Sequence, residues 1–412
     1  MRKFVIFQKK AGYRIMLLSE DEQVSQAYKN GPLGSVPIDW EKTPFSELFV
    51  SFIEYTNDLD RFPLYSLTIE DGVTAKTERY ERSHLVKKKN LYKVVRPNDF
   101  VYNPMNVRFG AIARYKGSSP VAVSGYYDVF SSVHESDSVF MENFLTFAPI
   151  ISYYNKVSTG SLIEKQRVHF SKFLKFAFPL PSLQERKKIA AILSTQDKVI
   201  ELKEKLLALK QQQKKYLMQQ LLMPKNKEKS FKAIHLSDIS CLINKHIDGQ
   251  KYNYVSTENI SPNLSGKVLF DESNIEISGV GFNAGDILVG NIRPYLKKVW
   301  RANKDGLCST DVLVFKPIGI SSEFLYYLIA NDNFFFNVMT TAKGSKMPRG
   351  DKKAIMSAKM LIPESRIEQN FIVEILSTAD HEINLLQESI EAEKQKKKAL
   401  MQLLLTGKVR VK

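Results

Sequence analysis

A segment near the middle of the chain recurs in the same order at its C-terminal end. Residues 192–195, with the letters ILST, match residues 375–378, an offset of 183 residues. The same offset aligns residues 214–219, with the letters KKYLMQ, with residues 397–402, with the letters KKALMQ. Internal repeats of this length indicate a duplicated architecture, so the chain contains two copies of one unit.

Weaker matches precede the repeated segment in both copies. Asp99 begins a DFVY run that corresponds to the DILV run beginning at Asp286. The Gly-Ser pair at residues 160–161 corresponds to the pair at residues 344–345. Short β-rich runs between turn-forming residues fill this part of each copy, which predicts two mixed α/β globules.

The second part of each copy has the pattern of one long helix. About 40 residues follow Ser182, and a similar number follow Pro363, without Pro or Gly. At ~1.5 Å per residue such a helix is roughly 60 Å long. Ser182 and Glu185 have the spacing of a capping box. Apolar residues recur at spacings of three and four, which predicts an intramolecular antiparallel coiled coil. The predicted packing residues are Ile192, Val199, Leu202, Leu206, Leu209, Leu376, Ile383, Leu386, Ile390, Leu400 and Leu404.

These patterns predict a mixed α/β (α+β) fold with an internal pseudo-twofold repeat, in which two long helices separate two globular domains. The expected segments are an N-terminal globular domain over residues 1–178, a helical spacer over 179–225, a second globular domain over 226–361 and a second spacer over 362–412. Residues 1–35 have no counterpart in the second half. They fit either an additional segment covering the helices or a variable arm.

The net charge of the chain indicates which class of partner it binds. The 60 Lys and Arg residues exceed the 44 Asp and Glu residues, for a net charge of +16. This excess favours a polyanionic partner, with nucleic acid ahead of a membrane surface. Two cysteines, Cys241 and Cys308, exclude a disulfide framework and a four-cysteine zinc site. No run approaches the ~18 apolar residues of a membrane-spanning helix. We expect a cytoplasmic protein.

Motifs for catalysis are absent from the sequence. Neither a G-x-x-x-x-G-K-[ST] phosphate loop nor an H-E-x-x-H zinc motif occurs. Residues 103–106, with the letters NPMN, faintly resemble the amine-binding loop of amino-methyltransferases, but they lack its second proline and its aromatic residue. We interpret them as a turn that ends a strand. The six histidines show no metal-ligand spacing. We predict neither a catalytic residue nor a metal site in this chain.

Basic residues at corresponding places in the two copies indicate binding chemistry. They follow the run at Asp99 and the run at Asp286, and they flank both Gly-Ser pairs. Arg can bond a guanine edge with two hydrogen bonds, whereas Lys mostly neutralises phosphate. The predicted DNA-binding residues are Lys87, Lys88, Lys89, Tyr92, Arg96, Arg108, Arg114, Lys116, Lys165, Arg167, Arg293, Lys297, Lys298, Arg301, Lys343, Lys346 and Arg349.

The residues at the beginning and at the end of both predicted helices have a sequence pattern that is found in one protein family. Residues 178–189 and residues 361–372 are similar to the apolar-Pro-Pro-x-x-Glu-Gln-x-x-Ile entry found in specificity (S) subunits of type I restriction–modification systems. The KKxLMQxLL ends of both helices, with residues 406–410 closing the second, are similar to the helix exit of that family. The resemblance extends from about Trp40 to Lys412.

The resemblance implies two target-recognition domains, each reading one half of a bipartite site in double-stranded DNA, with the helices setting the spacer. It implies that the chain has no cofactor and no catalytic activity of its own. Two methyltransferase (M) subunits would bring S-adenosylmethionine, and endonuclease/translocase (R) subunits would bring ATP hydrolysis and magnesium. Two alternatives stay open on the residues alone. One is a DNA methyltransferase-like enzyme with an unrecognised cofactor site, and the other is a coiled-coil adaptor that binds DNA without sequence preference.

Overall fold

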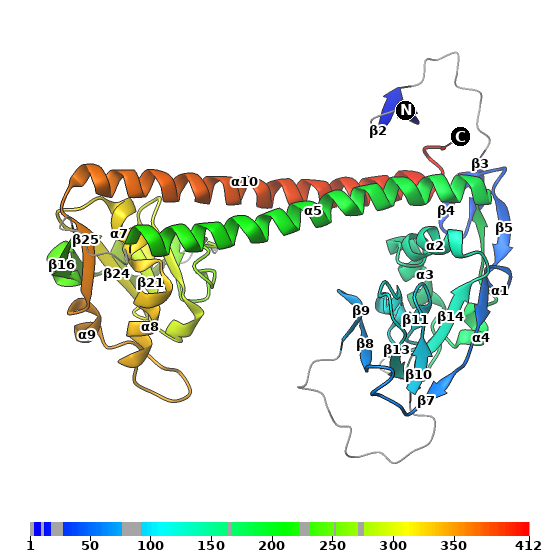
Figure 1. Cartoon of the computed structure of the whole chain (residues 1–412), viewed down its shortest axis with the longest axis horizontal. Coiled ribbons are helices and arrows are strands. Elements are labelled where there is room, and N and C mark those ends of the chain that lie inside the picture. Colours follow the sequence, from blue (N-terminus) through cyan, green and yellow to red (C-terminus); the bar gives the residue numbers. More distant parts are fainter. Residues whose placement is uncertain are drawn as a thin grey trace. The chain divides into compact units, whose positions relative to one another are not determined.

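The computed structural model describes residues 4–9, 12–17, 28–75, 92–162, 166–222, 231–250, 253–270 and 276–411. The chain forms two compact units (Figure 1). Unit 1 comprises Met1–Leu202 with Ile390–Lys412, and unit 2 comprises Lys203–Ser389. Two long helices, α5 (Leu183–Leu222) and α10 (Arg366–Leu404), each contribute one part to either unit. They lie within the two predicted spacer segments.

Unit 1 contains a mixed α/β lobe built from short elements. Its strands are β1 (Phe4–Lys9), β2 (Gly12–Leu17), β3 (Tyr28–Gly31), β4 (Gly34–Pro37), β5 (Glu41–Pro44), β6 (Phe49–Ser51), β7 (Tyr55–Thr56), β8 (Tyr65–Thr68), β9 (Gly72–Ala75), β10 (Tyr92–Val95), β11 (Phe100–Tyr102), β12 (Ile112–Arg114), β13 (Val121–Ser124), β14 (Asp128–Ser132) and β15 (Ala177–Leu180). Its helical elements are α1 (Phe45–Leu48), the 3₁₀ helices η4 (Val107–Phe109) and η5 (Glu135–Asp137), α2 (Ser138–Leu145), α3 (Ala148–Val157) and α4 (Phe170–Phe173).

Unit 2 contains the second lobe. Its strands are β16 (Phe231–His235), β17 (Ser240–Ile243), β18 (His246–Gln250), β19 (Tyr254–Val255), β20 (Glu276–Phe282), β21 (Ile287–Gly290), β22 (Val299–Arg301), β23 (Gly306–Cys308), β24 (Val312–Pro317) and β25 (Lys359–Pro363). Its helical elements are α6 (Leu236–Ile239), η8 (Pro294–Leu296), α7 (Ser322–Ile329), α8 (Asp332–Thr340) and α9 (Lys352–Met356).

The two lobes repeat one sheet topology, which confirms the duplication. The central sheet of unit 1 has the strand order β12-β11-β14-β6, and that of unit 2 has the order β22-β21-β24-β17. In each lobe the strand before the first short helix pairs with the strand that leads into the long helix, β5 with β15 and β16 with β25. The mixed α/β fold predicted from the repeat is therefore confirmed.

Cross-strand pairs explain why corresponding runs occupy corresponding places. Phe100 of β11 lies opposite Phe130 of β14, and their rings stack with centroids 5.3 Å apart. In unit 2 the corresponding pair is Ile287 of β21 and Phe315 of β24. All four side chains are fully buried. Such apolar pairs across an antiparallel ladder stabilise the sheet and fix its register.

The N-terminal end of α5 confirms part of the helix-entry prediction. The Glu185 amide donates to Ser182 Oγ at 3.3 Å, so Ser182 satisfies one free amide of the first turn. The Glu185 carboxylate does not return to close a capping box. It instead accepts two hydrogen bonds from the Arg410 guanidinium, at 2.7 Å and 2.8 Å.

The packing face of α5 differs from the predicted one. Of the predicted residues, Leu202, Leu206 and Leu209 are 54%, 45% and 63% exposed, so naming them as packing residues was wrong. Ile192 is buried, and Val199 is half-buried. The observed face alternates spacings of four and three and lies about one residue away on the helix. It consists of Ile189, Leu193, Gln196, Ile200, Lys203, Leu207, Lys210, Lys214, Leu217 and Leu221.

The packing face of α10 coincides with the predicted one. Leu376, Ile383, Ile390, Leu400 and Leu404 are buried, and Leu386 is half-buried. The prediction was correct here because the sequence of α10 contains one apolar stripe of this spacing, whereas that of α5 contains two. Its polar interruptions, at Glu393 and Lys397, meet polar residues of α5.

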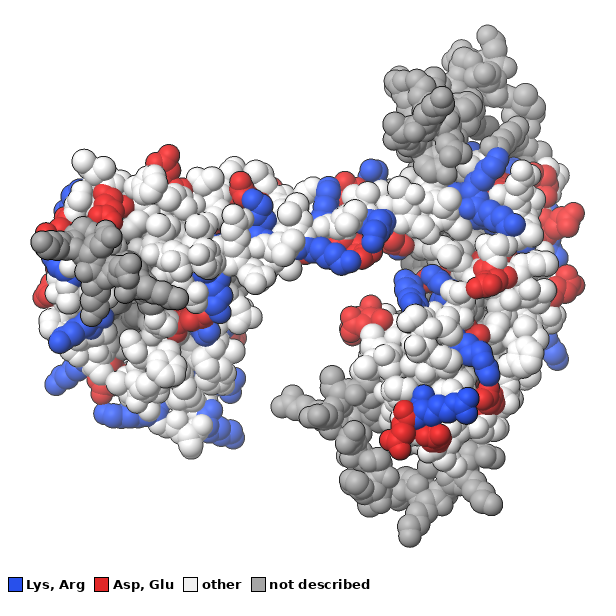
Figure 2. Space-filling model, in the orientation of Figure 1, with Lys and Arg blue, Asp and Glu red and all other residues white. Residues whose placement is uncertain are grey.

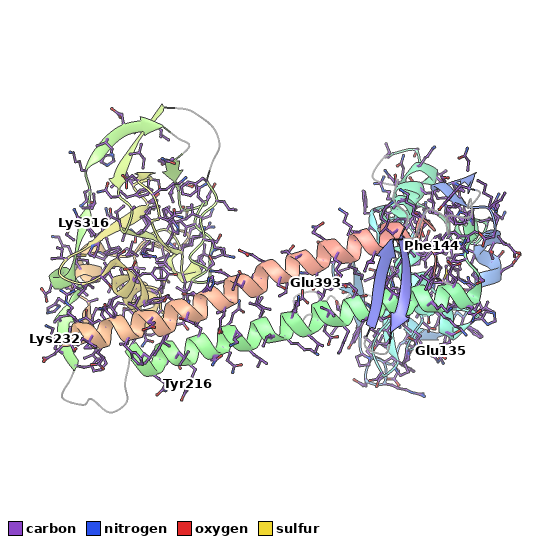
Figure 3. The ribbon with its side chains drawn as sticks, turned by 90° about the horizontal axis from the view of Figure 1, so that it is seen from above. Glu135, Phe144, Tyr216, Lys232, Lys316 and Glu393 are labelled. Carbon is purple, nitrogen blue, oxygen red and sulfur yellow. The ribbon has the colours of Figure 1, made fainter. Side chains whose placement is uncertain are left out.

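Figure 3 shows Glu393 on α10. Within unit 1, the Gln196 amide donates to the Glu393 carboxylate at 2.7 Å, and Lys397 forms an ion pair with Asp197 at 2.6 Å. Within unit 2, the corresponding ion pair joins Lys214 to Asp380 at 2.5 Å. The lysine and aspartate of the second pair lie 183 positions from their counterparts in the first. Further contacts in unit 2 join Lys203 to Ser389 and Lys210 to Glu382. Along these contacts the residue numbers increase on α5 and decrease on α10. The helix parts in each unit are therefore antiparallel.

The C-terminal tail packs against the core of unit 1. Val409 and Val411 are buried in the core that also contains Phe178 and Leu193. The Arg410 guanidinium binds the Glu185 carboxylate and the Asp39 carboxylate, the latter at 2.8 Å and 2.9 Å. Among the described residues no helix combines the length and apolar character needed to cross a membrane.

Candidate nucleic-acid interface

Two loops of unit 2 form a single braced structure, which we call the second loop pair. It consists of residues 291–297, which follow β21, and residues 343–350, which join α8 to α9. The Arg293 amide donates to the Pro348 carbonyl at 2.8 Å. Lys343 and Arg349 exchange two backbone hydrogen bonds of 2.9 Å, which close the second segment into a hairpin. The hairpin is therefore tied to the turn after the central strand.

Unit 1 contains the corresponding first loop pair, made of residues 103–110 after β11 and the described part of residues 158–168. Thr159 and Arg167 exchange two backbone hydrogen bonds of 3.0 Å, as Lys343 and Arg349 do. The Val168 amide donates to the Pro104 carbonyl at 2.9 Å. Arg108 Nη1 donates to Gln166 Oε1 at 2.9 Å. Both lobes thus present a hairpin fastened to the turn after the equivalent strand.

A buried asparagine braces each loop pair, and the sequence analysis assigned this bracing role to neither residue. Asn103 Oδ1 accepts from the amides of Met105 and Asn106 at 3.1 Å and 3.3 Å. Asn291 Oδ1 accepts from the Gly350 amide at 3.1 Å. The turn predicted at residues 103–106 is therefore present. The signal available in the sequence was that Asn follows the equivalent strand in both copies.

Three of the predicted DNA-binding residues present free cations on the loop pairs. Arg167, Arg293 and Lys346 are exposed, and none of them forms an ion pair within the described part of the chain. Figure 2 shows Lys and Arg side chains on both sides of the tip formed by the loop between α8 and α9. Cations held on short, tied loops can contact phosphates and base edges without first ordering the backbone.

Two further predicted residues, Arg349 and Lys343, lie on the hairpin of the second loop pair, and each of them is paired with a carboxylate. Arg349 donates to both oxygens of Asp311, at 2.9 Å and 3.4 Å. This contact raises the pKa of the Arg349 guanidinium above its ordinary value. Lys343 pairs with Asp351 at 3.0 Å, and it lowers the pKa of that carboxyl. Both side chains remain largely exposed, so DNA phosphates and these carboxylates would compete for them.

Other predicted residues are used inside the lobes. Arg114, at the end of β12, binds Glu142 of α2 at 2.9 Å and the side chain of Asn98 at 2.6 Å. Arg301, at the end of the equivalent strand β22, forms an ion pair with Glu323 of the equivalent helix α7. The match between the two copies therefore has a structural cause, since each arginine fastens an edge strand to a helix.

Apart from Lys297, which binds Asp332, the remaining predicted residues fall into three groups. Lys116 pairs with Glu142 at 2.7 Å, Arg96 pairs with Glu54 at 2.5 Å, and Lys298 donates to the Thr257 carbonyl at 2.5 Å. Tyr92 is half-buried at the start of β10. Lys87, Lys88, Lys89 and Lys165 lie outside the described residues.

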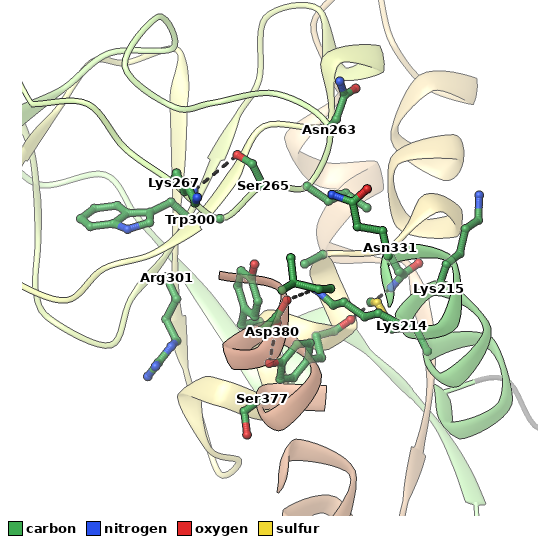
Figure 4. A pocket seen from close by; sticks show the side chains of 18 of the residues that line it. Lys214, Lys215, Asn263, Ser265, Lys267, Trp300, Arg301, Asn331, Ser377 and Asp380 are labelled. Carbon is green, nitrogen blue, oxygen red and sulfur yellow. Dashed lines mark hydrogen bonds and ion pairs between the residues drawn. The ribbon is translucent and has the colours of Figure 1, made fainter. Parts of the chain in front are cut away.

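A cavity of about 1150 Å³ lies in unit 2 between the lobe and the helix parts of that unit (Figure 4). Three lysines line this cavity, and Lys267 donates to Gln387 Oε1 at 2.6 Å. The other two are paired with carboxylates, Lys214 with Asp380 and Lys215 with Asp332 at 2.7 Å. Lys297 also binds Asp332, at 2.6 Å. The two lysines hold the pKa of Asp332 below its ordinary value. This network joins the lobe of unit 2 to α5 and does not offer free cations to an anion.

The described residues contain no group of three His, Cys, Asp or Glu side chains placed to hold a metal ion. Both cysteines are free thiols, and burial raises the pKa of Cys308 to about 12. Such a thiol is a poor nucleophile because its thiolate form is rare at neutral pH. The polar side chains on the loop pairs are suited to binding.

Comparison with known proteins places the two repeats in one family. The family model for the type I restriction modification DNA specificity domain matches residues 73–211 and residues 236–394. Together these matches cover more than half of the chain. The type I restriction enzyme MjaVIII specificity subunit of Methanocaldococcus jannaschii is 26% identical over 280 residues. That alignment covers 58% of this chain and 64% of the relative, so it spans slightly less than two thirds of the relative's length.

Solved structures share the fold. The S subunit of a type I restriction-modification system from M. genitalium matches with a TM-score of 0.55 at 12% identity, over 89% of this chain and 96% of that chain. A chain from a study of complex assembly and conformational transition in the type I R-M system matches with a TM-score of 0.54 at 12% identity, over 90% and 99%.

Proposed function

Because the chain belongs to the family of type I restriction modification DNA specificity domains, we propose that it is the specificity subunit of a type I restriction–modification complex. Each lobe reads one half of a bipartite target in double-stranded DNA. The observation that carries this proposal is the pair of equivalent loop pairs, one per lobe, with the exposed cations Arg167, Arg293 and Lys346.

Recognition divides between two kinds of contact. Arg167 and Arg293 can each form two hydrogen bonds with a guanine edge in the major groove. Lys346 and the flanking lysines neutralise phosphates and fix the register of the protein on the duplex. Asn103 and Asn291 act as positioning residues. Asn291 Oδ1 holds the Gly350 amide of the hairpin that carries Lys346, and Asn103 Oδ1 holds the turn to which the segment with Arg167 is tied through Val168.

The long helices set the spacer between the half-sites. Helices α5 and α10 contain 40 and 39 residues, which corresponds to roughly 60 Å at ~1.5 Å per residue. One turn of B-DNA is about 34 Å. A helix pair of that length is sufficient to hold two reading lobes about one turn apart.

The exposed face of α5 is the docking surface for a methyltransferase subunit. Leu206, Leu209 and Tyr216 recur at spacings of three and seven on this face and are exposed in unit 2. Figure 3 shows Tyr216 on the side of α5 away from α10. Apolar residues at this spacing fit a partner helix. Their contacts would cover side chains that the fold leaves in water.

Catalysis belongs to the partner polypeptides in this account. Two methyltransferase subunits supply S-adenosylmethionine and the methyl transfer, and endonuclease/translocase subunits supply ATP hydrolysis with magnesium. The complex acts on DNA in the cytoplasm. This chain contributes recognition, spacing and docking.

Competition binding tests the function. The complex of this chain with its methyltransferase subunits is expected to bind its target duplex, identified by mapping modified bases in the host, 10³-fold or more tighter than random duplex of equal length. Affinity should fall steeply with salt on both duplexes, because phosphate contacts release counterions. Equal affinity for both duplexes would support the non-specific adaptor instead. Binding of S-adenosylmethionine to the chain alone would support the enzyme alternative.

A further inference from the structure

Each lobe exposes one aromatic ring on the short 3₁₀ helix of its loop pair. Phe109 ends η4 and is 52% exposed, and Tyr295 lies in η8 and is 49% exposed. The two 3₁₀ helices are equivalent, since η4 follows β11 and η8 follows β21 in lobes of the same topology. One aromatic side chain therefore lies on the equivalent 3₁₀ helix of each copy, at the third residue of η4 and at the second residue of η8.

Isolated exposed apolar residues are common on protein surfaces and need no explanation. Two other exposed rings, Phe52 and Phe336, have no aromatic counterpart at the corresponding position of the other lobe. Phe52 follows β6, whereas Asn244 follows the equivalent strand β17. Phe336 is the fifth residue of α8, and the fifth residue of α3 is Ser152. The pair on the 3₁₀ helices is distinguished because it is retained in both lobes although the loops around it differ.

The backbone that carries Tyr295 is held in a specific shape. Arg293 and Lys297, on either side of η8, both adopt the left-handed region, with φ of 51° and 50°. Non-glycine residues in this region cost about 1 kcal/mol or more and persist where surrounding contacts hold them. Here the Arg293 amide binds the Pro348 carbonyl and the Lys297 side chain binds Asp332. Strain of this kind is typical of functional loops.

The backbone that carries Phe109 is held by comparable contacts. The Phe109 amide donates to the Asn106 carbonyl at 2.9 Å, and Gly110 follows with φ of 101°. A Cβ on Gly110 would lie 3.2 Å from a methyl group of Ile151, so this position favours glycine. Both rings therefore stand on prearranged tips, and binding through them costs little loop ordering.

A guanidinium accompanies each ring. The Arg108 guanidinium carbon lies 4.4 Å from the centroid of the Phe109 ring. The exposed Arg293 precedes Tyr295 by two residues. Duplex-binding proteins combine such cations, which contact phosphate or base edges, with an apolar wedge that enters a base step. A single ring in each lobe fits a wedge in a duplex better than a platform for single strands, which uses several rings in succession.

We propose that Phe109 and Tyr295 are specificity-determining residues that each insert a ring at a base step of one half-site and unstack it. The proposal rests on the proposed function, because it assigns a contact within the same DNA site. It adds a mode of recognition that depends on how easily the step deforms as well as on hydrogen bonding. Flexible pyrimidine–purine steps would be favoured at both wedge positions.

The test uses the complex with its methyltransferase subunits and the target duplex found by modified-base mapping. Phe109→Ala and Tyr295→Ala are each expected to weaken target binding about tenfold to hundredfold, and to leave random-duplex binding within about twofold. The aromatic replacements Phe109→Trp and Tyr295→Phe should retain target affinity. Phe52→Ala and Phe336→Ala serve as controls, because they remove exposed rings that lie outside the loop pairs of units 1 and 2.

A fluorescent adenine analogue at each position of the half-sites gives the second readout. Its emission should rise on binding of the wild-type complex at one step per half-site, and Phe109→Ala should abolish that rise in only one half. If the wild type discriminates its target while both alanine variants bind and fluoresce like wild type, the wedge proposal is wrong and the proposed function stands. If the wild type shows no preference for the target, the proposed function itself fails.

Discussion

Replacing Arg410 by alanine is expected to lower the free energy of unfolding of unit 1 by about 3–5 kcal/mol, because it leaves a buried carboxylate without its partner. Glu185 and Arg410 are 8% and 13% exposed, and they are joined by two hydrogen bonds. The Val411 amide also donates to Glu185, at 3.3 Å. Urea denaturation of the full chain, with hydrogen exchange of amides in unit 1, measures the change.

An exposed ion pair on the same helix provides the control. Lys198 and Glu201 are joined at 3.1 Å and are 58% and 47% exposed, so Lys198→Ala should cost only about 0–1 kcal/mol. Equal effects of Lys198→Ala and Arg410→Ala would show that the C-terminal tail does not hold unit 1 together.

Arg410 also lowers the pKa of Asp39 below its ordinary value of 3.8. The contribution of that pair is therefore complete above this value and is lost as the pH falls through the lower folded-state pKa.

Two leucines of α5 in unit 1 are expected to differ sharply when each is replaced by alanine. Leu193 is fully buried, so Leu193→Ala should lower the free energy of unfolding by about 2–5 kcal/mol through the cavity it leaves. Leu202 is exposed, so Leu202→Ala should change stability by no more than about 0.5 kcal/mol. Thermal unfolding of the two variants under one set of conditions measures the difference.

A larger loss of stability in Leu202→Ala than in Leu193→Ala would support the packing face that was predicted from the sequence.

The exposed leucines of α5 also allow a test of docking. The double variant L206A/L209A should keep nearly the stability of the wild type but bind the methyltransferase subunit more weakly in a pull-down titration. A variant that binds the subunit normally would remove this face from the docking surface.

The architecture was predictable from the sequence because it is repeated. A motif that recurs at one offset fixes the order of elements twice, so errors in one copy are corrected by the other. The two mixed α/β lobes, the long helices and their antiparallel arrangement were predicted in this way, but the strand order within the lobes was not. The register of α5 did not follow, since the helix has two apolar stripes of equal spacing, one through Leu193 and one through Leu202.

Polar contacts decide between the two stripes of α5. The true face includes Gln196, Lys203 and Lys214, which a search for apolar residues discards. Their partners lie on α10, and the nearest of them is 166 positions distant in sequence. The clamp of Arg410 on Glu185 was hidden for the same reason, since 225 positions separate the two residues.

The candidate interface was predicted less completely than the fold. Basic residues at matched offsets included the exposed Arg167 and Arg293, but they also included Arg114 and Arg301, whose match reflects ion pairs inside the lobes. A sequence cannot separate these groups, because both uses select arginine at the same distance from a strand. Phe109 and Tyr295 were not found, since their shared exposure is visible only in three dimensions.

Shortening the two helices together tests the central claim, that a helical spacer joins two independent readers of DNA. Residues 203–209 of α5 face residues 383–389 of α10, as the contact between Lys203 and Ser389 shows. Removing seven residues from each preserves the heptad and shortens the pair by roughly 10 Å. Modified-base mapping should then find the same two half-sites with a spacer about three base pairs shorter, at ~3.4 Å per base pair. An unchanged spacer, or altered half-sites, would contradict the account.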